Sequence, residues 1–403
     1  MISDGYRVRN EELGPVGIPF VRGGNIGDGW IDTNVADHVR PEFVGRVSPK
    51  LSQPGDVAFI TKGSVGRVGR LRHGQPTVVL APQVAWWRVV DRTIIDPTFL
   101  FYLLRGPSFQ ASLYGVKTHG SMVADYVSIS QQLEFWLRLP PIADQRDIAR
   151  ILGALDDKIE LNRRMSETLE TTARAIFEST LGPSPADLVE QREASGNARW
   201  AFMPFTDLVE VVGGGTPRTA EPAFWDGAIP WFSVVDAPNV GGVWVMETER
   251  AITAAGLASV STRLLPIGTT ILSARGTVGK VALVGRPMAM NQSCYGLISK
   301  IGALGYFTYF QTRALADELR QRAHGSVFDT ITRDTLQGIS TVCPPPEAVR
   351  RFEDAVHPLM LRMQVAQEES GTAIRLRDGL LPKLISGAMS SGRLTEDRGA
   401  TGV

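Results

Sequence analysis

The chain carries the same nine-residue loop twice, and this duplication limits its possible folds more than any other feature. Residues 61–69 read TKGSVGRVG, and residues 274–282 read ARGTVGKVA. Two glycines and two valines recur unchanged 213 positions later, and Lys62, Ser64 and Arg67 are matched by Arg275, Thr277 and Lys280, which have the same chemical type. A repeat at fixed spacing predicts two copies of one structural unit.

Other landmarks extend the repeat to a whole domain. Four stretches of the first half match stretches of the second half in the same order. They are GIPFVRGGNIGDG (17–29) with AIPWFSVVDAPNVGG (228–242), LSQPGDVAFI (51–60) with LLPIGTTILS (264–273), APQVAWW (81–87) with MNQSCYG (290–296), and HGSMVADYVSISQQLEFWLRLPP (119–141) with HGSVFDTITRDTLQGISTVCPPP (324–346). Four landmarks in one order indicate a tandem duplication. Short β-branched runs broken by Gly and Pro predict strands in each copy. One helix per copy is expected, near Thr98–Arg105 and near Tyr306–Ala323. The fold class is therefore α+β, with two tandem mixed domains.

A heptad pattern follows each Pro-Pro pair and predicts two long helices. Its seam positions, most of them apolar or small, are Ile148, Leu152, Leu155, Ile159, Asn162, Ser166, Leu169, Ala173 and Ile176 in the first copy, and Phe352, Val356, Leu359, Met363, Ala366, Ser370, Ala373, Arg377, Leu380 and Leu384 in the second. We expect the two helices to pair as an antiparallel coiled coil in which Asn162 fixes the register. The alternative is that each helix packs only on its own domain. A helix of about 32 residues would span about 48 Å, and Pro358 is expected to kink or delay the second helix.

These patterns divide the chain into six segments. They are a domain at 1–140, a helical region at 141–181, a linker at 182–199, a second domain at 200–344, a second helical region at 345–389 and a polar tail at 390–403. The order of domain, helix, domain, helix predicts two similar modules related by a pseudo-twofold axis.

The charge pattern separates the domains from the first helical region. Although 42 Lys and Arg balance 42 Asp and Glu, residues 57–90 and 250–316 contain no acidic residue, whereas residues 142–193 hold eleven acids against seven bases. Two basic blocks suit a polyanion contacted at two places; chance clustering on solvated surfaces is the alternative. The candidate DNA contacts are Lys62, Ser64, Arg67, Arg70, Gln83, Arg275, Thr277, Lys280, Asn291 and Gln292. The alternative to a DNA contact is a solvated hairpin tip for the loop residues and a buried, hydrogen-bonded amide for Gln83 and Gln292.

Familiar catalytic and metal-binding motifs do not occur in the sequence. There is no GxxxxGK[ST], GxGxxG, GxSxG or HExxH, and GTVGKV (276–281) places Val281 where a phosphate-binding loop needs Ser or Thr. The two cysteines, Cys294 and Cys343, form no CxxC pair, which favours a reducing cytoplasm and no zinc site. His119 and His324 recur, and a turn or packing role is expected for them. No signal peptide or membrane span is predicted.

Several stretches together resemble the specificity subunit of type I restriction-modification systems. They are GGGTPRTAEPAFWDGAIPW (213–231), the loops KGSVGR (62–67) and RGTVGK (275–280), LPPIADQRDIARILGALDDKIELNRR (139–164) and LLPKLISGAM (380–389). The second post-proline stretch, PPPEAVRRFEDAV (344–356), departs from the first because it lacks a pair like Asp144-Gln145.

The resemblance implies a DNA-recognition subunit without catalytic activity or a cofactor of its own. Each domain would read one half of a split target in double-stranded DNA through the major groove, and the helical pair would set the unread gap. The helical regions would also dock two modification subunits, which methylate adenine with S-adenosylmethionine. Restriction subunits, which hydrolyse ATP with magnesium, would then join. The rival readings are an enzyme with a duplicated phosphate-binding loop and a bilobed scaffold that does not bind DNA.

Overall fold

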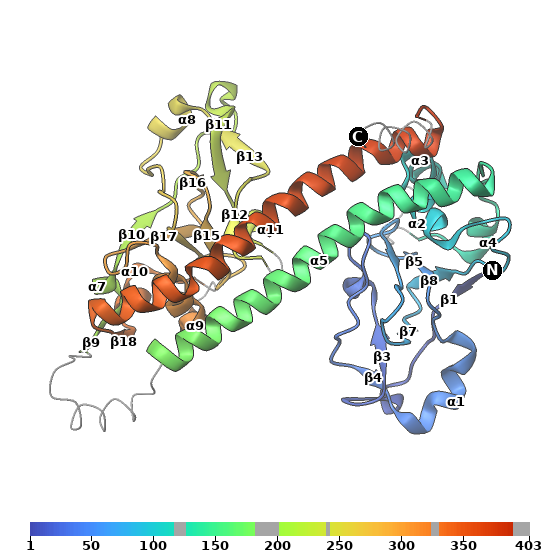
Figure 1. Ribbon diagram of the computed structural model, residues 1–403, viewed down its shortest axis with the longest axis horizontal. Coiled ribbons are helices and arrows are strands. Elements are labelled where there is room, and N and C mark those ends of the chain that lie inside the picture. Colours follow the sequence, from blue (N-terminus) through green and yellow to red (C-terminus); the bar gives the residue numbers. More distant parts are fainter. Residues whose placement is uncertain (117–125, 182–200, 239–241, 324–329, 390–403) are drawn as a thin grey trace, which may run out of the picture. The chain divides into compact units, whose positions relative to one another are not determined.

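The computed structural model describes residues 1–116, 126–181, 201–238, 242–323 and 330–389, and its contacts group the chain into two compact units. Unit 1 comprises Met1–Asp157 and Ala373–Val403, and unit 2 comprises Lys158–Thr372. Two long helices, α5 (Ile142–Leu181) and α11 (Pro346–Ser386), each contribute to both units (Figure 1). The compact units therefore differ from the six sequence segments, because each unit combines one domain with parts of both helices.

The described residues of unit 1 form two small sheets and four short helices besides their parts of α5 and α11. Its strands are β1 (Ile2–Asp4), β2 (Leu13–Gly14), β3 (Ile18–Val21), β4 (His38–Val39), β5 (Val57–Ile60), β6 (Val68–Arg70), β7 (Val79–Leu80) and β8 (Val84–Trp87), and its helices are α1 (Val44–Val47), α2 (Pro97–Arg105), α3 (Pro107–Val116) and α4 (Ile129–Leu133). The first sheet has the order β1-β8-β5-β6 and is antiparallel; the second has the order β2-β4-β3-β7, with β3 and β7 parallel.

Unit 2 is larger and repeats the same arrangement. Its strands are β9 (Ala201–Pro204), β10 (Val209–Gly213), β11 (Trp225–Phe232), β12 (Trp244–Val245), β13 (Arg250–Ile252), β14 (Thr270–Ser273), β15 (Val281–Val284), β16 (Ala289–Met290), β17 (Cys294–Ser299) and β18 (Ser340–Cys343), and its helices are α7 (Phe205–Leu208), α8 (Ala254–Ala258), α9 (Tyr306–Ala323) and α10 (Arg333–Gln337). Its main sheet has the order β10-β17-β14-β15-β12, and β18 pairs with β9 in a separate ladder.

The tandem duplication predicted from the sequence is confirmed by the strand pairing. The order β1-β8-β5-β6 in unit 1 reappears as β10-β17-β14-β15 in unit 2, and the parallel pair β3–β7 reappears as β11–β16. The helices expected in each copy are α2 and α9. Helix α2 begins where Pro97 supplies a fixed φ and the Asp96 carboxylate accepts from the N–H groups of Thr98 and Phe99, at 2.8 and 3.0 Å.

The two long helices exceed the predicted length. Helix α5 has 40 residues and α11 has 41, which corresponds to about 60 Å each at 1.5 Å per residue. The expectation that Pro358 delays the second helix was wrong, because α11 begins at Pro346 and continues through Pro358. The neighbouring Val356 and Met360 are fully buried, and such packing compensates for the hydrogen bond that a proline removes.

Helices α5 and α11 pair in antiparallel fashion within each unit, as the heptads predicted. In unit 2, Asn162 Nδ2 donates to the carbonyl of Ala366 at 3.0 Å and to Ser370 Oγ at 3.2 Å. In unit 1, Leu152 lies in one hydrophobic cluster with Leu384. The predicted seam residues Ile148, Leu152, Asn162, Ser166, Ala173, Phe352, Val356, Met363, Ala366, Ala373, Arg377 and Leu384 are buried, and Leu155, Ile159, Leu169, Ile176, Leu359, Ser370 and Leu380 are half-buried. The helices also pack on their own domains, so the alternative reading describes only part of their contacts.

A buried ionic network ties α2 to the seam in unit 1. Asp156 is 5% exposed and accepts from the Tyr102 hydroxyl at 2.6 Å and from Arg377 Nη1 at 2.9 Å. The Arg105 guanidinium lies 4.0 Å away. Burial, followed by the Asp156 carboxylate, raises the pKa of Tyr102 well above its usual range. Tyr102 therefore stays protonated and donates its hydrogen bond.

Unit 2 contains a similar tie between α9 and the seam. Glu170, on α5, pairs with Arg313 at 3.1 Å, and Arg313 in turn donates to the Tyr309 hydroxyl at 3.4 Å. In both units a tyrosine and an arginine of the domain helix thus meet an acid of α5.

The second helical region lacks a pair like Asp144-Gln145 of the first, and the structure explains this difference. Gln145 is buried and accepts from the N–H of Asp96 at 3.0 Å, the residue that caps α2. In the second copy, Glu353 on α11 accepts from the N–H groups of Leu304 and Tyr306, at 3.0 and 3.1 Å, where α9 begins. Different residues of the two long helices therefore hold the start of the domain helix in each unit.

We expect Asp156→Ala to destabilise unit 1 by about 3–5 kcal/mol, because it removes the buried counter-charge of Arg377, whose other carboxylate partner, Asp378, is 54% exposed. The matched control is Asp157→Ala, since Asp157 is 71% exposed and pairs only with Arg72 on the surface, where such a pair contributes about 0–1 kcal/mol. Hydrogen exchange of the α2 amides at increasing denaturant measures the free energy of unfolding of unit 1 in both variants. Equal losses in the two variants would contradict the importance of the buried network.

Candidate nucleic-acid interface

The two repeated loops are the tips of corresponding β-hairpins. One joins β5 to β6, and the other joins β14 to β15, with antiparallel pairing in both cases. The six candidate side chains at the tips are exposed, namely Lys62, Ser64, Arg67, Arg275, Thr277 and Lys280. Each unit therefore presents two cationic side chains and one hydroxyl on a single short turn.

Two glycines in each loop shape the turn in different ways. Gly63 and Gly276 have φ of +85° and +74°, and a side chain there would meet nothing within 4 Å. Gly66 and Gly279 also have positive φ, but they are buried against a helix, and a Cβ would come within 2.9 Å of Gln110 on α3 or of Arg320 on α9. The first glycine permits the turn, and the second lets the loop lie close to the helix.

Main-chain hydrogen bonds fix the base of both loops in the same way. The N–H of Val127 donates to the carbonyl of Thr61 at 2.9 Å, and the N–H of Ile331 donates to the carbonyl of Ala274 at the same distance. In unit 1 the Gln110 side chain also donates to the Gly66 carbonyl at 3.1 Å. The exposed cations are thus carried on an anchored turn.

This geometry does not suit a nucleotide-binding loop. A glycine-rich loop that cradles phosphate is followed by a helix, whose N-terminal N–H groups face the anion. Here each loop is followed by a strand, β6 or β15. The hypothesis of an enzyme with a duplicated phosphate-binding loop therefore loses its main support. The two loops are interpreted as basic hairpin tips.

The other candidate residues lie in more varied surroundings. Arg70 is half-buried, donates to Thr98 Oγ1 at 2.7 Å and lies over the Phe101 ring at 5.2 Å; burial lowers the pKa of its guanidinium. Gln83 is half-buried, and its carbonyl accepts from Thr61. Arg70 is thus engaged inside unit 1. Arg67 is more exposed, although its guanidinium donates to the Ile26 carbonyl at 3.2 Å.

The amides of the second unit lie after β16. Asn291 accepts from the N–H of Ser293 at 3.0 Å, and the exposed Gln292 accepts from the Thr216 hydroxyl. The alternative reading of Gln292 as a buried amide is wrong, since its side chain is exposed, and its contact with DNA stays a prediction. His119 and His324, with the repeated His-Gly-Ser steps, fall outside the described residues.

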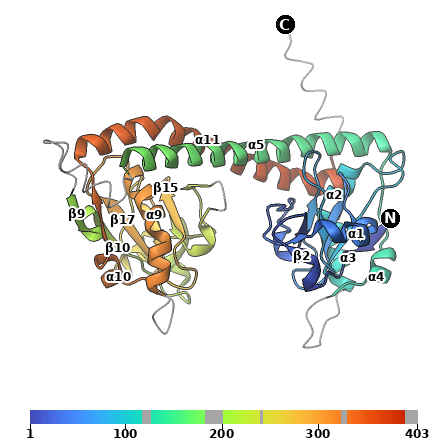
Figure 2. The same ribbon diagram turned by 90° about the horizontal axis from the view of Figure 1, so that it is seen from below.

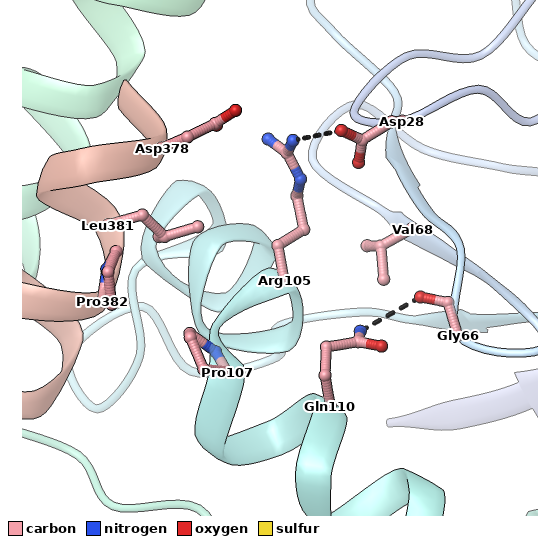
Figure 3. Close-up of a pocket in the computed structure, with 9 residues that line it drawn as sticks. All are labelled: Asp28, Gly66, Val68, Arg105, Pro107, Gln110, Asp378, Leu381 and Pro382. Carbon is pink, nitrogen blue, oxygen red and sulfur yellow. Dashed lines mark hydrogen bonds and ion pairs between the residues drawn. The ribbon is translucent and has the colours of Figure 1, made fainter. Parts of the chain in front are cut away.

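A cavity of about 340 Å³ lies behind the first hairpin (Figure 3). Figure 3 shows Arg105 directed at Asp28, with an ion pair of 2.9 Å, and Gln110 directed at Gly66. The remaining lining residues are Val68, Pro107, Asp378, Leu381 and Pro382. The cavity places no nucleophile beside a base, so these contacts support the hairpin from behind. Asp28 and Arg105 were not found from the sequence, because their pairing joins positions 77 residues apart.

Over the part of the chain that the structure describes, no group of three or more His, Cys, Asp or Glu side chains could hold a metal ion. Within the same residues, no helix is both long and apolar enough to cross a membrane.

Comparison with known proteins identifies the second domain directly. Residues 197–353 match the family model of the type I restriction modification DNA specificity domain. The second domain is therefore similar to this DNA specificity domain, and the strand order of unit 1 shows that the chain carries the same arrangement a second time.

Individual relatives agree with this assignment over different lengths. The MjaIX specificity subunit of Methanocaldococcus jannaschii is 32% identical over 155 residues, which are 38% of this chain and 36% of that protein. This match therefore spans only about a third of that relative's length. The HindI specificity subunit of Haemophilus influenzae is 22% identical over 361 residues, which cover 74% of this chain and 78% of that protein.

A solved structure shares the fold of this chain. The crystal structure of the type I restriction-modification S subunit from M. genitalium superposes with a TM-score of 0.58 and 16% identity, covering 95% of this chain and 93% of that one. Mixed α and β domains combined with long helices are therefore the fold shared by both.

We expect Gly66→Ala to destabilise unit 1 more than Gly63→Ala. Both positions have positive φ, where an alanine costs about 1–2 kcal/mol, but only at Gly66 would the new methyl lie 2.9 Å from Leu113 and Gln110, which adds about 1 kcal/mol or more of overpacking. Thermal unfolding compares the two variants. A larger loss for Gly63→Ala would contradict the close packing of the second glycine.

Proposed function

We propose that this chain is a specificity subunit that recognises a split sequence in double-stranded DNA, with one half read by each unit. The observation that carries the proposal is that both units present the same exposed basic hairpin tip, built on the same strands and anchored by the same main-chain hydrogen bonds. Cations on an anchored turn neutralise phosphates and fix the protein's position on the duplex. Lys62, Arg67, Arg275 and Lys280 have this role in the proposal.

Base reading in this proposal involves the polar side chains nearest the tips. Ser64 and Thr277 project from the turns beside the cations, and Asn291 and Gln292 follow β16 in unit 2. Amide side chains can pair with adenine through two hydrogen bonds, and arginine can pair with guanine. Gln83 is the corresponding candidate in unit 1. Arg70 would first have to leave Thr98, so its role is to support β6 and the tip.

The paired helices set the gap between the two half-sites in this proposal. Helices α5 and α11 contribute to the cores of both units and are joined along their seam by buried apolar contacts and by Asn162. A rigid helical pair permits only a narrow range of separations between the sequences that are read.

The same helices also dock the partner subunits in this proposal. The seam residues named from the heptads are largely buried against the facing helix, so the docking contacts must come from outward positions such as Leu161 and Leu361, which are 62% and 44% exposed. The partners are two modification subunits, which methylate adenine with S-adenosylmethionine, and restriction subunits, which use ATP and magnesium. This chain needs no cofactor for its own part, and it works in the cytoplasm, where the DNA lies.

The double variant Lys62→Ala/Arg67→Ala is expected to weaken DNA binding by the complex and to reduce its salt dependence. Each lost phosphate contact lowers the slope of log K against log salt by about 0.9. The matched control is Arg92→Ala, since Arg92 is an exposed arginine of unit 1 away from the tip. DNA-binding titrations at several salt concentrations measure the affinity and its salt dependence for the double variant and for the control. If the slope of log K against log salt is unchanged in the double variant, the hairpin does not contact DNA phosphates.

The permitted gap provides a separate test of the helical pair. We expect the complex to bind a duplex with the natural gap far more tightly than one whose gap is changed by one or two base pairs, because each added pair moves a half-site by about 3.4 Å and also rotates it. Sequencing of methylated sites in a host that expresses the complex supplies the natural target. Equal affinity for all three duplexes would exclude a fixed gap.

A further inference from the structure

The second repeat ends in a strand that is covered by another segment of the chain. Strand β18 pairs antiparallel with β9, so that Thr341 lies opposite Met203 and Ser340 lies opposite Pro204. The N–H of Phe205 extends the ladder by donating to the carbonyl of Ile339 at 2.8 Å. Phe205 itself is fully buried in the core of unit 2. A short apolar strand followed by an aromatic residue thus closes this edge.

The first repeat contains the counterpart of β18. Helix α4 corresponds to α10, and both begin at a hydroxyl cap within a capping box, Ser128 in one and Thr332 in the other. Counting from these caps, 136–139 correspond to β18 at 340–343, and the Pro-Pro steps that precede α5 and α11 follow in both copies. The same chain path is therefore present in unit 1.

The counterpart segment has the side-chain pattern of a strand. Phe135, Leu137 and Leu139 are partly buried and pack on the hydrophobic cluster of unit 1. Trp136 and Arg138 alternate with them and are exposed, Trp136 to 97%. Among the described residues, none forms a hydrogen bond with the main-chain N–H or C=O groups of 136–139. Alternation without a ladder is typical of an edge that can pair with another strand.

We propose that residues 136–139 are a strand-acceptor edge that binds an extended segment of a partner protein in antiparallel orientation. The second repeat shows the chemistry of the occupant: an apolar residue facing the core, a proline beyond it and then an aromatic, as in Met203, Pro204 and Phe205. Main-chain hydrogen bonds supply affinity in this mode of recognition, and alternate side chains supply specificity.

The exposed residues of the edge indicate how the occupant differs from β9. Trp136 takes the place of Ser340, so the residue opposite it, equivalent to Pro204, meets an indole instead of a hydroxyl. Arg138 takes the place of Val342, which lies opposite Phe202. An aromatic residue at that position of the partner would stack on the guanidinium. The edge in unit 1 therefore favours a more aromatic strand than β9.

A labelled peptide with the sequence of residues 201–208, AFMPFTDL, is the probe, and the protein is the full chain. We expect saturable binding and slower hydrogen exchange at 135–139. The ladder continues from Phe205 through alternate residues, so the N–H of Met203 faces the acceptor and that of Phe202 faces away. Methylating the peptide nitrogen at Met203 is expected to weaken binding at least about tenfold, the effect of losing roughly one hydrogen bond. The same methylation at Phe202 is the matched control and is expected to leave binding unchanged.

A protein variant tests the edge independently. Trp136→Ala is expected to weaken the peptide several-fold, whereas Trp30→Ala, which removes another exposed tryptophan of unit 1, leaves binding unchanged. Three results would each overturn the proposal. They are equal effects of the two methylations, protection at 340–343 in place of 136–139, and binding that appears only after residues 390–403 are deleted, which would make the chain's own tail the occupant.

Discussion

The antiparallel seam between α5 and α11 is the constraint on which the rest of the structure depends. Neither long helix can bury its apolar stripe alone, and neither domain completes its core without the helices. In unit 1, Ile148 and Leu152 share one hydrophobic cluster with Leu381, from the other helix, and with α2. In unit 2, Phe177 and Phe352 do the same with Phe307 of α9. The seam is therefore part of both cores, and a domain cannot loosen from it without exposing apolar surface.

Buried polar contacts along the seam determine which residues meet. Burying Asp156 and Arg377 gains little net stability, because both lose their hydration. Their pairing with Tyr102 nevertheless defines one arrangement of α2 on the helices, since any other would leave a buried charge without a partner. Asn162 acts in the same way in unit 2, where its amide reaches Ala366 and Ser370. Such contacts fix which residues of the domain helices meet the seam, which additional apolar area would not do.

Much of the fold could be predicted because its signals are local. The repeated loop, the β-branched runs and the heptads lie in short windows, and they led to β5, β14, α9 and the helical pair. The length of α5 was underestimated, because its ends lack the apolar periodicity on which the heptads depend. The hairpin tips were located correctly as exposed basic turns. The surroundings of Arg70 could not be predicted, because Thr98 and Phe101 approach it only in the folded state. Whether these residues contact DNA stays a prediction.

The sequence by itself determined that the chain is a duplication, that each copy carries a glycine-rich basic turn, and that two amphipathic helices must find partners. Those properties follow from residue types and their spacing, which can be read from short stretches of the sequence. Only the tertiary structure decided that Val127 and Ile331 anchor the two turns, that Asp156 meets residues from two distant segments, and that, among the described residues, Trp136 lies on an edge without a ladder whereas Ser340 lies on a paired one. The physical reason is that hydrogen-bond partners and burial depend on contacts between residues far apart in sequence, and folding alone brings those residues together.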